Sequence, residues 1–140
     1  MLARSAVVVA VLAAVVLSGC PCGNPDLPVT LIPLSGPFGY AVRGPYGLEG
    51  HLTKENLTDA EWRLRGSFQF PNSGYAVLGP EVLVMESYPE QVLIRLRVLL
   101  PAPGTITLPV ITERPVAVDV AASNEAVFTV VVQERCAPAL

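Results

Sequence analysis

Hydrophobic and polar residues alternate in several short stretches of the chain. In QVLIRLRVLL, residues 91–100, every even-numbered position is apolar, whereas Arg95 and Arg97 fall on the opposite face. This period of two is typical of a strand with one face buried and the other in water. The preceding stretch EVLVMES is followed by YPEQ, in which Pro89 favours a turn. We therefore predict a hairpin of residues 81–88 with residues 91–100.

Two further stretches show the same alternation. PVAVDV and AVFTVVVQ are separated by the turn residues AASNE, which predicts a second hairpin of residues 115–121 with residues 126–134. In WRLRGSFQF, residues 62–70, apolar and polar residues alternate on both sides of Gly66, where we expect a bulge or a bend. The largest apolar residues of these stretches are the expected core: Trp62, Phe68, Ile94 and Phe128.

Prolines and glycines divide the rest of the chain into short pieces. The sequence contains 14 prolines and 11 glycines, too many for long helices, and only TKENLTDAE has the composition of a helical turn. Apolar residues resume soon after position 25, so we expect early edge strands there. Recurring short strands separated by turns predict an all-β fold, namely a single antiparallel β-sandwich, immunoglobulin-like or related, with seven to nine strands over residues 26–140.

The first twenty residues have a different pattern. One positive charge at Arg4 precedes the apolar run SAVVVAVLAAVVL, which ends in the small residues Ser18 and Gly19. This is the pattern of a secretory signal peptide, and an apolar run of this length spans only about 20 Å of the roughly 30 Å of hydrocarbon in a bilayer. The segment LSGC resembles the lipobox of bacterial lipoproteins.

That resemblance implies a lipoprotein signal peptide over residues 1–19 and a diacylglycerol thioether on Cys20, which becomes the new N-terminus. Residues 20–25 then form a short tether, and several acyl chains make the membrane attachment durable. Pro21 after the cysteine favours the outer membrane, by resemblance to known sorting patterns, in a cell that has one. The alternative is an ordinary signal peptide cleaved elsewhere, with Cys20 available for a disulfide.

The cysteine count agrees with lipidation. The chain contains three cysteines, an odd number, which in an exported protein leaves one thiol unexplained. If Cys20 carries lipid, then Cys22 and Cys136 remain for a disulfide that would close nearly the whole domain into one loop. With Cys20 excluded, the sequence offers no further thiol or histidine near either cysteine that would favour a redox or metal site.

Charge restricts the classes of partner. The net charge is −3, and Lys54 is the only lysine, so the chain has neither the basic surface expected for nucleic-acid binding nor a polybasic membrane segment. The "RxR" pairs 63/65 and 95/97 could bind an anion, but we expect them to pair with glutamates across neighbouring strands on an open sheet face.

Part of the chain resembles a known family. From Ser67 onward, a Gly74–Tyr75 pair at the start of a strand, a PxPG loop at Pro101–Gly104 and a last strand after Pro115 are similar to the C-terminal domain of PrcB-type proteins. The resemblance covers about fifty residues. It implies a small β-sandwich module of bacterial surface proteins, named after an accessory subunit of a surface protease, and it carries no catalytic residues.

No catalytic centre is predicted. His51 is the only histidine and has no nucleophile motif beside it, so a surface position is expected. The chain lacks a convergent set of metal ligands, and we predict no metal, cofactor or small-molecule substrate. Glu81, Glu86, Glu90 and Glu113 could form a glycosidase-type carboxylate pair only if the fold brought two of them together.

The sequence therefore favours a lipid-anchored protein of the bacterial envelope that is not an enzyme. We expect a binding or accessory module that docks a protein partner, with a surface protease as one candidate, through loops or a sheet edge. Two alternatives remain open. One is a structural spacer domain, and the other is a protease inhibitor that acts through the loops NSGY and PAPG.

Overall fold

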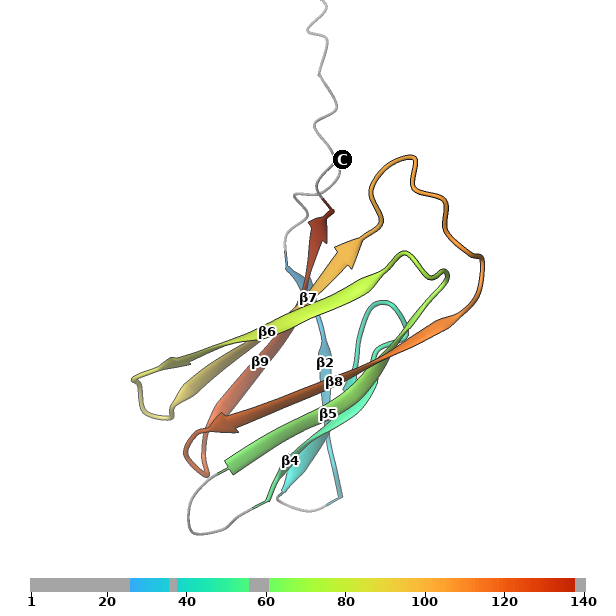
Figure 1. Cartoon of the computed structure of the whole chain (residues 1–140). Helices are drawn as coiled ribbons and strands as arrows, with labels where there is room; N and C mark the ends of the chain where they lie inside the picture. Colours follow the sequence, from blue (N-terminus) through green and yellow to red (C-terminus); the bar gives the residue numbers. More distant parts are fainter. Residues whose placement is uncertain (1–25, 36–37, 56–60, 138–140) are drawn as a thin grey trace, which may run out of the picture.

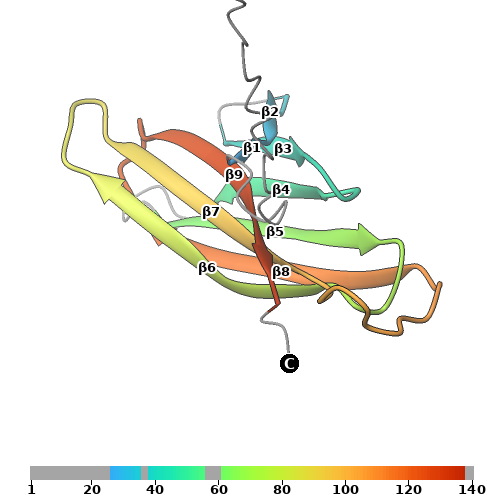
Figure 2. The same ribbon diagram turned by 90° about the horizontal axis from the view of Figure 1, so that it is seen from above.

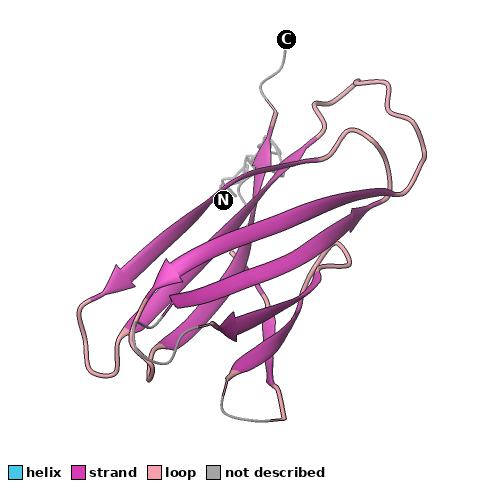
Figure 3. Cartoon of the chain, turned by 60° about the horizontal axis from the view of Figure 1, so that its bottom comes forward, coloured by secondary structure: helices cyan, strands magenta, loops and turns pink. Residues whose placement is uncertain are grey.

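The computed structural model describes residues 26–35, 38–55 and 61–137, and these residues form only strands, turns and loops (Figure 3). The strands are β1 (Leu27–Pro28), β2 (Thr30–Pro33), β3 (Gly39–Arg43), β4 (Glu49–Lys54), β5 (Glu61–Phe70), β6 (Ala76–Met85), β7 (Gln91–Leu100), β8 (Thr112–Ala121) and β9 (Val127–Cys136). In this part of the chain no helix has the length and apolar character needed to cross a membrane. The expected signal peptide, Cys20 and Cys22 lie outside the described residues, as does most of the expected helical turn.

Two sheets pack face to face (Figures 1 and 2). One sheet has four strands in the order β1-β9-β7-β6, and the other has five in the order β2-β3-β4-β5-β8. The chain changes sheet at Val29, whose N–H donates to the carbonyl oxygen of Val130 over 3.1 Å, so β1 and β2 together close one side of the sandwich. The predicted β-sandwich of seven to nine strands is confirmed, and its early strands lie at sheet edges as expected.

The core lies between the inward-facing rows of the two sheets. In β7 the alternation found in the sequence is the alternation of burial, because Val92, Ile94, Leu96 and Val98 are buried and the intervening side chains are partly exposed. All four predicted core residues are buried: Trp62, Phe68, Ile94 and Phe128. Trp62 and Phe128 come from different sheets, and their ring centroids lie 4.7 Å apart, so the aromatic rings join the two layers.

The first predicted hairpin is confirmed and the second is wrong. Strand β6 pairs antiparallel with β7 from Ala76–Leu99 to Met85–Gln91. Residues 115–121 and 126–134 do form strands, but β8 pairs with β5 in one sheet, whereas β9 pairs with β7 and β1 in the other. Each strand has only one apolar face, and the two faces meet across the core instead of side by side. Alternation identifies the buried face of a strand but not its lateral neighbour.

This crossing also corrects the expectation of a wholly antiparallel sandwich. Strand β8 lies in the opposite sheet between β7 and β9 in sequence, so β9 returns in the same direction as β7 and the two pair in parallel from Gln91–Val127 to Leu100–Cys136. A parallel pair requires a long crossover connection. Here the crossover is the loop 101–111, strand β8 and the turn that follows it.

The bulge expected at Gly66 is also wrong. Trp62, Leu64, Phe68 and Phe70 share the buried face, so the alternation passes through Gly66 without a change of phase. Gly66 instead lies opposite Gly50 of β4, where the two backbones approach closely. The irregularity of register lies in β6, between Leu78 and Glu81, where Gly79 and Pro80 interrupt the pairing.

The close approach of β4 and β5 predicts that Gly50→Ala is destabilising. A Cβ atom at Gly50 would lie 2.3 Å from the carbonyl oxygen of Arg65, which is backbone and cannot move aside easily. We expect a loss of about 1 to 3 kcal/mol in the free energy of unfolding, the cost typical of overpacking, and a corresponding fall in Tm. Gly79→Ala is the matched control, because a Cβ atom there meets nothing within 4 Å. Equal Tm values for the two variants would contradict this account.

Candidate functional site

The loops NSGY and PAPG, which were proposed from the sequence as an inhibitor site, belong to two connections that meet at one end of the sandwich. The N–H of Ser73 donates to the carbonyl oxygen of Leu108, and the N–H of Leu108 donates to Ser73 Oγ, both over 3.1 Å. Cys136 ends β9 at this same end, opposite Leu100. We call this the cysteine end, and the opposite end, with the β6–β7 and β8–β9 connections, the distal end (Figure 1).

The connection from β7 to β8 presents apolar side chains to solvent. Its PAPG segment forms a turn in which the Thr105 N–H donates to the Ala102 carbonyl oxygen, with Gly104 at a φ of 80°, a conformation that favours glycine. Beyond this turn four large apolar side chains are exposed: Ile106, Leu108, Val110 and Ile111. Since the backbone near Leu108 is held by Ser73, these side chains stay exposed on an ordered loop.

An aromatic cluster closes the core at the cysteine end. Tyr46 lies in the tight turn between β3 and β4, and its ring centroid is 5.6 Å from those of Phe70 and Tyr75. Its hydroxyl donates a hydrogen bond to Glu134 Oε1 of the opposite sheet. Burial raises the pKa of the Tyr46 hydroxyl, and the bond to Glu134 raises this pKa further. The hydroxyl is therefore a fixed donor that ties the turn to β9.

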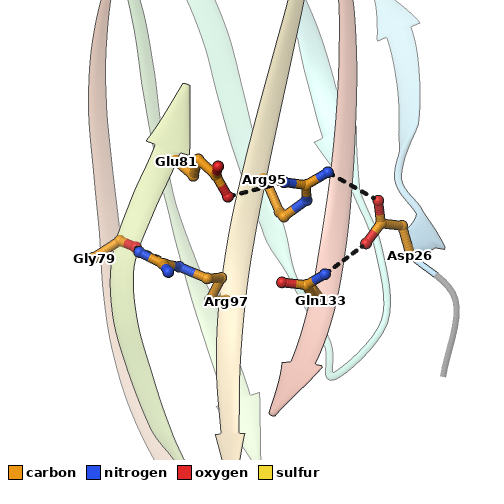
Figure 4. A network of polar contacts seen from close by, with 6 residues as sticks. All are labelled: Asp26, Gly79, Glu81, Arg95, Arg97 and Gln133. Carbon is orange, nitrogen blue, oxygen red and sulfur yellow. Dashed lines mark hydrogen bonds and ion pairs between the residues drawn. The ribbon is translucent and has the colours of Figure 1, made fainter. Parts of the chain in front are cut away.

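The outer face of the four-stranded sheet carries a polar row across its strands (Figure 4). Arg95 of β7 contacts Glu81 Oε2 of β6 at 2.9 Å and Asp26 Oδ2, just before β1, at 3.5 Å. Gln133 of β9 donates to Asp26 Oδ1 over 3.2 Å, and Arg97 donates to the carbonyl oxygen of Gly79. Arg95 thus holds the edge strand β6 and the segment that enters β1.

The other RxR pair lies on the outer face of the five-stranded sheet. Arg63 Nε donates to Asp119 Oδ1 over 2.7 Å, and Arg65 lies 3.4 Å from the same oxygen. The hydrogen bond from Arg63 lowers the pKa of Asp119, and the positive charges of Arg63 and Arg65 lower this pKa further. The predicted pairing with glutamates is found for Arg95, with Glu81, and for Arg63, with Glu55. Arg65 pairs with Asp119 instead, and Arg97 donates to a backbone oxygen.

The residues proposed for acid–base chemistry are dispersed. His51 is exposed on β4, as expected for a surface histidine. Glu81 is paired with Arg95 on β6, Glu90 accepts the Ser123 N–H, and Glu113 lies on β8 in the other sheet. Glu86 and Glu90 do line one shallow depression at the distal end. Within the described ranges, no three side chains of the types that bind metals lie close enough together to hold a metal ion.

The distal depression measures about 410 Å³ and lies between the β6–β7 and β8–β9 connections. Tyr88, 92 % exposed, donates to Glu125 Oε2 over 3.1 Å, and the Trp62 indole N–H donates to the carbonyl oxygen of Ser123. Three glutamates surround this depression: Glu86, Glu90 and Glu125. The distal end is therefore acidic, whereas no charged residue lies between Arg97 and Glu113 at the cysteine end.

The distal half of β6 is an exposed sheet edge. Strand β6 is the last strand of its sheet, and Val82, Leu83, Val84 and Met85 are all exposed. The corresponding inward positions on β7 are fully buried, so the core ends between the two strands. Sequence reasoning did not identify this edge, because a strand's own residues do not show whether a neighbour covers it. The run VLVM beside a Gly-Pro pair was the available indication.

Of the cysteines predicted to carry lipid or to form a disulfide, only Cys136 lies among the described residues. Cys136 is the last residue of β9, and its thiol is not free. Cys20 and Cys22 lie outside the described residues, so lipidation and the Cys22–Cys136 pairing stay predictions. Strand β1 runs antiparallel to β9, with Leu27 opposite Val132, so the chain enters β1 from the cysteine end.

Comparison with known proteins gives no relative: no family model, curated protein or solved structure matches this chain.

The Glu81–Arg95 pair predicts a pH-dependent contribution to stability. The hydrogen bond from Arg95, and then its charge, lower the pKa of Glu81 below its ordinary value of 4.5. The stabilisation is therefore complete above the pKa of an unfolded glutamate and is lost as the pH falls through the lower pKa of the folded protein. We expect Glu81→Gln to be less stable than the wild type near neutral pH and the difference to shrink in acid.

Urea unfolding midpoints of both proteins across this range measure the effect. Glu113→Gln removes a carboxylate that makes no ion pair within the described ranges, and its difference from the wild type should change little with pH. A difference for Glu81→Gln that stays constant into acid would show that the Arg95 pair does not contribute.

Proposed function

We propose that this protein is a lipid-anchored protein of the bacterial envelope, attached through Cys20, and that it binds an extended segment of a partner protein along the free edge of β6. The observation that carries the binding role is the edge itself, where four exposed apolar residues, 82–85, follow one another without a charge. The role assigned is binding, with no catalytic residue.

A free sheet edge offers backbone N–H and C=O groups to another strand. Natural sheets usually protect such edges with short strands, prolines, bulges or charged side chains. Here β1 and β2 are short and contain Pro28 and Pro33, and β8 carries Pro115. The bulge at Gly79–Pro80 protects only the first half of β6. The unprotected half suits a partner strand that gains affinity from backbone hydrogen bonds and specificity from side-chain contacts.

Lipid attachment is supported by the sequence LSGC and by the direction of the chain. The polypeptide enters β1 from the cysteine end, so Cys22 precedes Leu27 by five residues while Cys136 follows Val132 by four. Continuing the β1–β9 register over that length would bring the two cysteines to about the same level. This spacing favours a Cys22–Cys136 disulfide and leaves Cys20 for lipid.

The resemblance to the C-terminal domain of PrcB-type proteins supports an accessory role, with a surface protease as the candidate partner. The marks on which it rests, Gly74–Tyr75 and Pro101–Gly104, lie in the two connections that meet at the cysteine end. The alternative is a spacer domain. A spacer domain would differ from a binding module because it would have no stoichiometric partner.

Three cysteine variants test the anchor. Cys20→Ser should lose the acyl mass and leave the membrane fraction, because no other thiol in LSGC can carry the thioether. Cys22→Ser should remain acylated and membrane-bound but expose one titratable thiol, at Cys136. Because the disulfide that closes a loop of about 100 residues is then lost, the free energy of unfolding should fall by up to about 4 to 5 kcal/mol. Cys136→Ser should behave like Cys22→Ser. Continued acylation of Cys20→Ser would contradict attachment through Cys20, whereas a new free thiol in it would favour the ordinary signal peptide, in which Cys20 forms a disulfide.

Leu83→Lys tests the edge. Leu83 is 53 % exposed on β6, and a lysine there should weaken the docking of a partner strand while leaving the fold intact. Leu93→Lys is the matched control, because Leu93 is half-buried directly opposite Leu83 on β7, a strand that is paired on both sides, with β6 and with β9. The measurement is the amount of partner recovered from crosslinked envelopes. We expect a several-fold loss for Leu83→Lys alone.

Other outcomes contradict this proposal. Equal losses in both variants would mean that the sheet face, not its edge, binds the partner. Recovery of neighbours in non-stoichiometric amounts from the wild type would identify a spacer.

A further inference from the structure

We infer that the connection from β7 to β8 inserts its exposed apolar side chains into the interfacial region of the bilayer that carries the anchor. The residues are Ile106, Leu108, Val110 and Ile111. This inference rests on the lipid anchor of the proposed function, and it adds a second membrane contact made by the folded domain itself.

The short tether keeps this loop near the membrane. Cys20 precedes Asp26 by six residues, which span at most about 20 Å when fully extended. Asp26 lies beside Gln133, and the remaining residues of β9 up to Cys136 extend about 10 Å further toward the cysteine end. The tether therefore leaves only about 10 Å between the cysteine end and the lipid. The loop leaves β7 at Leu100, directly beside Cys136, so it lies at that end.

The composition of the loop fits lipid. From Val98 to Thr112 the chain contains no charged residue, and its exposed large side chains are aliphatic. Protein-binding surfaces concentrate aromatic residues and arginine at their energetic centres, whereas aliphatic side chains gain free energy simply by leaving water for hydrocarbon. Glu86, Glu90 and Glu125 line the depression at the other end of the sandwich, where they stay in water.

The loop is also prepared for insertion. Ser73 and Leu108 exchange two hydrogen bonds, and the turn at Ala102–Thr105 fixes the start of the loop. Most of the cost of ordering this segment is therefore met when the domain folds. Its side chains are exposed on a backbone that these hydrogen bonds hold, and Ile106 is 97 % exposed.

Tryptophan fluorescence in reconstituted vesicles tests the inference. The acylated full-length mature protein is reconstituted into phosphatidylethanolamine–phosphatidylglycerol vesicles that contain brominated phosphatidylcholine as a quencher. Ile106→Trp places the reporter on the loop, and Tyr88→Trp places it on the distal end, at a position of almost equal exposure. The native Trp62 is buried and supplies the same background in both proteins.

We expect the emission of Ile106→Trp to shift to the blue and to be quenched several-fold more strongly than that of Tyr88→Trp. Adding Leu108→Asp and Ile111→Asp to Ile106→Trp should abolish this difference while acylation is unchanged. Equal quenching of the two reporters in an acylated protein would overturn the membrane contact and leave the anchor standing.

Two further outcomes also overturn the inference. If mass spectrometry finds no acyl chain on Cys20, the anchor fails, and the membrane contact fails with it. If the loop reporter of the Ile106→Trp protein is shielded in a way that depends on protein concentration but not on brominated lipid, a second copy of the chain covers the loop instead of the bilayer.

Discussion

The burial of one face of β7 is the constraint on which the rest of the structure depends. Its inward row, Val92 to Val98, packs against the opposite sheet and leaves the charged residues of the strand on the other face. Those outward positions are then available for Arg95 and Arg97, which tie β6 and the entrance of β1 to the same strand. Because β7 lies between β9 and β6, it fixes the position of the strand that carries Cys136 and of the strand that forms the free edge. One alternating sequence thus positions the core, the cysteine end and the free edge of β6.

The sequence was sufficient to predict the elements whose information is local. The period of two in residues 91–100 predicts both the strand and its buried face, and the short connection through Pro89 predicts the hairpin with β6. The choice of the neighbouring strand in a sheet, in contrast, is not determined by a strand's own residues. Val116, Val118 and Val120 give β8 one apolar face, and that face can be buried either beside β9 or across the core from it. Only the packing of the whole chain decides between these two arrangements. It places β8 across the core from β9, and the parallel pairing of β7 with β9 is the consequence.

The same reasoning explains why the sites were predicted unequally. Cross-strand pairing of arginine with carboxylates follows from alternation, so the partners of Arg63 and Arg95 could be anticipated as a class. The proximity of Ser73 to Leu108 could not, because the two residues belong to separate connections that meet only after β8 has crossed to the other sheet. Gly66 shows the converse error. A glycine in a strand suggests a bulge, but here the missing side chain allows β4 and β5 to approach at Gly50.

The irregularity in β6 divides the strand into a partly covered half and an exposed half. Before the bulge, Val77 and Leu78 lie near Pro115 and Val116 of β8, so the two sheets meet there and the edge is partly covered. After the bulge, Glu81 to Met85 resume regular pairing with β7 and lie in the distal half of the sandwich. A partner strand added to this edge would lose its register at Gly79–Pro80, which limits the added segment to about five residues. The same limit would keep such a partner away from the cysteine end, so that the proposed membrane contact there and the proposed partner on β6 would not compete for the same surface.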